Sequence, residues 1–132
     1  MKITADTNVL VRAMTGDDAA QSRIAQAELA NAEVVALALP SLCELVWVLS
    51  RGYKVAPPDI VAAIRRLIDA ANVAVNRPAT EAGLAMLEAG GDFADGVIAH
   101  EGNCLGAEAF VSFDKRAVEL LEAQGRAALL LA

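Results

Sequence analysis

ITADTNVLVRAM, residues 3–14, has the pattern of a short strand followed directly by a helix. Polar and apolar residues alternate up to position 5, and the next three residues, Asp6-Thr7-Asn8, are of types that cap helix N-termini. The segment after them is mostly apolar and stops at Gly16. A strand that leads straight into a helix is the repeating unit of α/β proteins, so we expect this unit to recur along the chain.

Further strands and helices do alternate in the remaining sequence. Strands are predicted at 33–39, 73–75, 109–113 and 127–131, and helices from 17, over 40–53, from 57, over 78–90, 93–105 and 114–124. Short apolar strands between helices predict an α/β fold with a mostly parallel sheet of roughly five strands. No linker or repeat interrupts the pattern, so residues 1–132 are predicted to form a single domain.

Composition supports a helix-rich domain with one hydrophobic core. Hydrophobic residues make up 56% of the 132 residues and charged residues 21%, which is unlike a disordered chain. Ala, the best helix former, is abundant, whereas aromatic residues supply only 4% and so disfavour a β-sandwich.

Charge and cysteine usage exclude several protein classes. The net charge of −6 excludes a basic coat for nonspecific binding of nucleic acid, although bound divalent cations can supply positive charge locally. No apolar run is long enough to span a membrane, and no secretory leader is visible. Cys43 and Cys104 suggest neither a disulfide framework nor a zinc site. We therefore expect a protein of the reducing cytoplasm.

Acidic residues stand where predicted strands meet helices. Asp6 and Asp114 each end a strand and precede a helix, so in a parallel sheet both lie at the edge where α/β proteins bind ligands. Asp is also a favoured helix N-cap, which is a purely structural explanation for either residue. Asp92 and Asp95, three residues apart, similarly resemble a capping box.

Glu44 has no such capping explanation. It lies inside the predicted helix 40–53 among Leu42, Leu45 and Val46, where a carboxylate is rarely buried unless it is paired or binds a metal. A solvent-facing position between apolar stripes is the alternative, but the helix is apolar almost all round and such a face is not expected. Several acids near one sheet edge would repel one another without a cation, and oxygen ligands alone favour Mg²⁺ or Mn²⁺ over Zn²⁺.

Four segments in this order resemble the PIN domain, specifically the VapC-type toxins of bacterial toxin–antitoxin pairs. They are the segments 5–10 (ADTNVL), mid-helix Glu44, 92–99 (DFADGVIA) and 110–114 (FVSFD). The resemblance spans nearly the whole chain. It implies a three-layer α/β/α sandwich and a metal-dependent endoribonuclease that uses water as the nucleophile. It further implies an RNA substrate, a cognate antitoxin and a homodimer.

The resemblance also implies roles for individual residues. Asp6, Glu44, Asp95 and Asp114 match the acidic quartet that binds one or two Mg²⁺ or Mn²⁺ ions, and Asp92 matches an accessory acid. Polar neighbours that could orient carboxylates or waters are Thr7, Asn8 and Ser112. Gly96 stands where Ala is common in the family, which we expect to matter little.

Other readings of the same residues remain open. One is a PIN-like binding module without activity. Another is a phosphate-accepting receiver-like domain, although Lys115 directly follows Asp114 and no Lys ends a later strand. The pair His100 and Cys104 is not expected to form a metal site, since two ligands are too few.

Aromatic and basic residues have plain explanations as well. Trp47 and Phe93 are predicted to lie in the core or a dimer interface rather than to stack on bases. RNA phosphates could be contacted by five basic residues, but ordinary surface charge is the simpler interpretation of each: Arg12, Arg51, Lys54, Lys115 and Arg116.

Overall fold

A computed structural model describes residues 1–132, which divide into two compact units, Met1–Asn76 and Arg77–Ala132. Helices and parallel strands alternate through both units, so the predicted α/β class is confirmed. The five strands form two parallel sheets, one of three strands and one of two, where a single sheet of roughly five was expected. Each unit is therefore described by itself.

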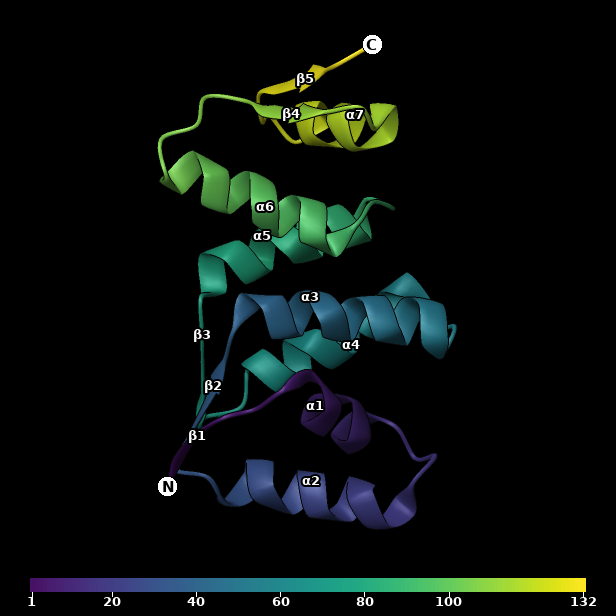
Figure 1. Cartoon of the computed structure of the whole chain (residues 1–132), viewed down its shortest axis with the longest axis vertical. Coiled ribbons are helices and arrows are strands. Elements are labelled where there is room, and N and C mark those ends of the chain that lie inside the picture. Colours follow the sequence, from purple (N-terminus) through teal and green to yellow (C-terminus); the bar gives the residue numbers. More distant parts are fainter. The chain divides into compact units, whose positions relative to one another are not determined.

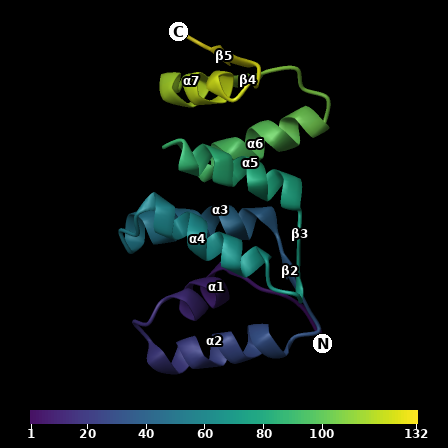
Figure 2. The ribbon, with the colours of Figure 1, turned by 180° about the vertical axis from the view of Figure 1, so that it is seen from behind.

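The first unit is built on a three-stranded parallel sheet in the order β1-β2-β3. Its elements are β1 (Lys2–Thr4), α1 (Thr7–Met14), α2 (Ala19–Asn31), β2 (Val34–Leu37), α3 (Leu39–Trp47), the π-helix η1 (Val48–Gly52), α4 (Pro57–Ile68) and β3 (Val73–Val75). Ile3 pairs with Val35, and Ala36 pairs with Ala74. Figures 1 and 2 show the strands along one side of this unit and the helices extending from them.

The core of the first unit comes from the apolar stripes that the sequence predicted. Leu42, Leu45, Val46 and Leu49 of α3 and η1 are all buried. Ile60 and Ile64 of α4 are completely buried, as is Leu10 of α1. The predicted helix 40–53 thus exists, but its last turn from Val48 is wound as a π-helix.

Helix α2 buries a different face from the one expected. Ala20, Ile24 and Ala27 share one apolar face at helical spacing, which predicts that this face is buried, whereas the structure buries Ser22 and Ala25 and leaves Ile24 65% exposed. An Ala-rich helix has little contrast between its faces, so the pattern was a weak guide.

The second unit combines three helices with a two-stranded parallel sheet. Its elements are α5 (Arg77–Glu88), α6 (Phe93–Cys104), β4 (Phe110–Ser112), α7 (Lys115–Ala123) and β5 (Ala128–Leu130). Val111 pairs with Leu129. Phe93 is only 1% exposed and packs against Gly83 of α5, which confirms its predicted place in the core.

No helix in either unit combines the length and the apolar character needed to span a membrane.

Candidate active site

Asp6 stands between β1 and α1, as the sequence predicted. Its backbone is extended, and its Oδ1 accepts a hydrogen bond of 3.1 Å from the backbone N–H of Val9, so it is the N-cap of α1. The carboxylate is exposed and its second oxygen has no hydrogen bond. Thr7 is half-buried and Asn8 is exposed at the start of the helix, and neither side chain makes a hydrogen bond.

Glu44 lies in the second turn of α3 and is exposed. The helix therefore does have an open face, contrary to the expectation from its apolar composition. That face also carries Trp47, one turn further on, which is 63% exposed and so does not lie in the core, one of the two places predicted for it. Because β1 and β2 are paired in parallel and α1 packs against α3, Asp6 and Glu44 both belong to helices that begin at the same sheet edge.

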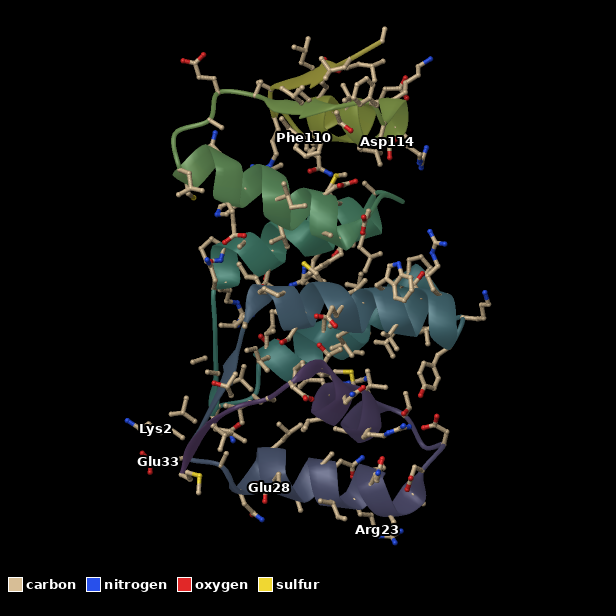
Figure 3. All side chains as sticks on the ribbon, in the orientation of Figure 1. Lys2, Arg23, Glu28, Glu33, Phe110 and Asp114 are labelled. Atoms are coloured by element: carbon tan, nitrogen blue, oxygen red, sulfur yellow. The ribbon has the colours of Figure 1, made fainter.

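The second unit contributes two further N-cap carboxylates. Asp92 Oδ1 accepts from the Ala94 N–H at 3.1 Å, and Asp114 Oδ1 accepts from the Ala117 N–H at 3.2 Å. The Ser112 hydroxyl accepts from the Asp114 N–H at 2.9 Å, so Ser112 fixes the turn that presents this carboxylate. Figure 3 shows Asp114 where α7 begins, beyond the strand that carries Phe110.

Asp95 differs from the other acids because it caps nothing. It lies half-buried in the first turn of α6, and its carboxylate makes no hydrogen bond or ion pair, so the expected reciprocal capping box with Asp92 does not form. Burial raises the pKa of Asp95, and the nearby carboxylates of Asp92 and Asp114 raise it further. Asp95 therefore lies close enough to Asp92 and Asp114 to interact with them electrostatically.

The donor chemistry of this cluster fits a hard divalent cation. Asp92, Asp95 and Asp114 offer only carboxylate oxygens, the ligands that Mg²⁺ and Mn²⁺ prefer, and the charges of Asp92 and Asp114 disfavour the ionisation of Asp95. No three acidic, His or Cys side chains are already drawn together as a preformed ligand group. The structure thus shows carboxylates of suitable chemistry in this region but no preformed metal site.

His100 has a different environment from the acids. Its Nε2 lies 3.6 Å from Cys104 Sγ, and Nδ1 lies 3.4 Å from an Arg126 guanidinium nitrogen. The Arg126 guanidinium beside the ring is electrostatically unfavourable for a second cation there. The sequence pattern gave no indication of the Arg126 contact, because the two residues come from separate elements.

Comparison with known protein families gives one match. Residues 3–122 match the family model described as the PIN domain, which covers nearly the whole chain and all four of the motif segments. No curated protein sequence matches the chain significantly.

Proposed function

The chain belongs to the PIN-domain family, and on this premise we propose that it is a metal-dependent endoribonuclease, the toxin of a VapBC-type toxin–antitoxin pair. PIN domains are generally nucleases and typically use divalent metal ions. The observation that carries the proposal is Asp95 in the first turn of α6, which has no hydrogen-bond partner and whose pKa is raised by burial and by the carboxylates of Asp92 and Asp114. Such a perturbed, unpaired acid is typical of a functional site.

We propose that Asp6, Glu44, Asp95 and Asp114 together hold Mg²⁺ or Mn²⁺, and that residues 1–132 act as one nuclease domain. When bound, such an ion supplies positive charge for the scissile phosphodiester and activates water for attack. Asp6 and Asp114 can bind through the oxygen that the helix cap leaves free. One carboxylate of the set would accept the proton that the attacking water loses.

The accessory residues would act by positioning. Ser112 holds the backbone of Asp114 by a hydrogen bond and so limits where its carboxylate can point. Asp92 places negative charge beside Asp95. Unlike Asp95, it uses one carboxylate oxygen as a helix cap, because its Oδ1 accepts a hydrogen bond from the Ala94 N–H. Thr7 and Asn8 have side chains free to orient bound water at the start of α1.

The nuclease proposal is tested with purified protein and RNA. We expect cleavage with Mg²⁺ or Mn²⁺, none in EDTA, and none by Asp6→Asn or Asp95→Asn, which keep side-chain volume but remove a charge. Calorimetric titration with Mn²⁺ supplies a second measurement that does not depend on the RNA chosen. Cleavage that survives exhaustive chelation would refute the metal mechanism, and metal binding with no cleavage of any RNA would favour a PIN-like binding module.

The toxin role needs a test in cells. Expression of the chain alone should arrest growth, and Asp95→Ala should relieve the arrest. Equal toxicity of the two proteins would show that nuclease activity is not the cause. We propose that the partners are a cognate antitoxin with a basic segment, which would complement the net charge of −6, and a second copy of the chain.

A further inference from the structure

The exposed face of α3 carries the only tryptophan of the chain. Trp47 is 63% exposed, although aromatic side chains of this size are usually buried, and the chain has only five aromatic residues in all (one Trp, one Tyr and three Phe). Its position is three residues after Glu44, so the indole lies about one helical turn from a proposed metal ligand. An exposed indole at this place is suited to contact whatever approaches Glu44.

Two cations without ion pairs follow Trp47 in the sequence. Arg51 lies in the last turn of the π-helix η1, four residues after Trp47, and Lys54 follows the end of this helix at Gly52. Both are exposed and neither has an acidic partner, whereas Arg12 is paired with Asp17 and Lys115 with Glu119. Two unpaired cations within seven residues of an exposed aromatic side chain are unexpected in a chain with a net charge of −6.

The segment that carries these cations is held in place. The Tyr53 hydroxyl donates to Asp17 Oδ2 at 2.7 Å, and the Val55 N–H donates to the Leu49 carbonyl at 2.9 Å. Lys54 has a φ of 56°, a left-handed conformation that disfavours non-glycine residues. Such backbone outliers and π-turns are enriched at functional sites. Arg51 thus lies on the π-helix and Lys54 on the turn that follows it, and hydrogen bonds on either side of Lys54 hold that turn.

We propose that one surface of the chain binds an unpaired strand of the RNA substrate. This surface, called the Trp47 face, consists of Trp47, Arg51 and Lys54. This inference rests on the proposed nuclease function and adds a binding surface to it. A base of the strand stacks on the indole, and the flanking phosphates lie on the two cations. A second copy of the chain would fit this face less well, because it would have to bury two unpaired positive charges.

Binding can be measured directly because Trp47 is the sole tryptophan. The full chain in EDTA is titrated with a short single-stranded oligoribonucleotide, and the same sequence in a duplex serves as the control. We expect saturable quenching of the tryptophan fluorescence by the single strand and much weaker quenching by the duplex. Absence of quenching at saturating RNA, or equal quenching by both forms, would overturn the proposal.

Variants separate stacking from charge, with affinity measured by anisotropy of labelled RNA. Trp47→Leu should weaken binding roughly tenfold, and Trp47→Phe should retain most of the affinity. Arg51→Ala and Lys54→Ala should each reduce the slope of log affinity against log salt by about 0.7, the value for one phosphate contact on a single strand. The matched control is Arg23→Ala on the outer side of α2 (Figure 3), which should leave the slope unchanged.

Two further outcomes would overturn the proposal. Unchanged RNA affinity in Trp47→Leu, together with loss of self-association in sedimentation, would assign the face to a second copy. If Arg23→Ala lowers the slope of log affinity against log salt as much as Arg51→Ala does, the salt dependence reports the overall charge of the protein and not contacts at the Trp47 face. The nuclease proposal fails separately: a parent protein that shows quenching but never cleaves RNA refutes the activity and supports the Trp47 face, whereas cleavage without quenching refutes only the face.

Discussion

Gly96→Ala should destabilise the second unit, although the same change normally strengthens a helix. Gly96 lies in the first half of α6 where this helix packs against α5. A Cβ at this position would fall against the Ala82 carbonyl oxygen, 2.8 Å from Met86 Cγ and 2.9 Å from the Ala82 carbonyl carbon. Backbone atoms of a packed helix cannot rotate away, so the two helices would have to separate.

Two opposing terms set the size of the effect. Replacing Gly by Ala within a helix stabilises by about 1 kcal/mol. Inserting a methyl group into a filled interior costs about 1–3 kcal/mol, and the upper end applies because Gly96 meets backbone. We therefore expect a net loss of about 1–2 kcal/mol, and the displaced first turn of α6 would carry Asp95 with it.

Gly102 provides a matched control in the same helix. The nearest atom to a Cβ at Gly102 is Ala107 Cβ at 3.9 Å, an ordinary contact, so Gly102→Ala should gain about 0.5 kcal/mol from helix propensity near a helix end. Urea denaturation in EDTA gives both free energies of unfolding without any contribution from bound metal. If Gly96→Ala is as stable as the parent or as Gly102→Ala, the helix contact is not as close as described.

Three other predictions concern two carboxylates and a third glycine. Asp95→Asn should stabilise the metal-free protein at pH 7 by roughly 0.5 kcal/mol, discounted for partial exposure, because the raised pKa means that the ionised carboxylate opposes folding. That gain should vanish in urea melts as the pH falls through the raised pKa towards 3.8. Asp17→Ala should show the opposite pH dependence, because hydrogen bonds from Tyr53 and Thr15 lower the pKa of Asp17. The ionised carboxylate therefore stabilises the fold at neutral pH, and this contribution is lost as the pH falls below 3.8. Urea melts of parent and variant at neutral pH and below pH 3.8 measure the difference. Gly83→Ala should destabilise less than Gly96→Ala in the same melts, because a Cβ there meets the Phe93 ring, 2.6 Å away, rather than backbone.

The order of strands and helices could be predicted because the local signals are strong. Asp6, Asp92 and Asp114 were recognisable as helix N-caps, and the structure shows each accepting the expected backbone N–H. The stripe from Leu42 to Leu49 repeats at helical spacing and is buried. These features depend on neighbours within a few residues of each other, which the sequence displays directly.

Features set by packing between elements could not be predicted. Gly96 was expected to matter little, yet its surroundings on α5 leave no room for a side chain. The exposure of Trp47 and Ile24 likewise depends on which helix face finds a partner, and composition alone favoured burial for both. The contact of Arg126 with His100 joins residues 26 positions apart, and no periodicity reveals it.

The capping and metal-binding interpretations of the aspartates are compatible, because each uses a different oxygen. The cap bonds of Asp6 and Asp114 involve Oδ1 alone, and a carboxylate has a second oxygen with two lone pairs for a cation. A stability measurement on an Ala variant therefore reports the cap, at about 1 kcal/mol, and says nothing about the ligand. Asn caps a helix as well as Asp does but lacks the charge. Asp114→Asn should thus keep the stability of α7 and lose Mn²⁺ affinity, whereas Asp114→Ala should lose both; a metal affinity unchanged in Asp114→Asn would leave Asp114 as a cap only.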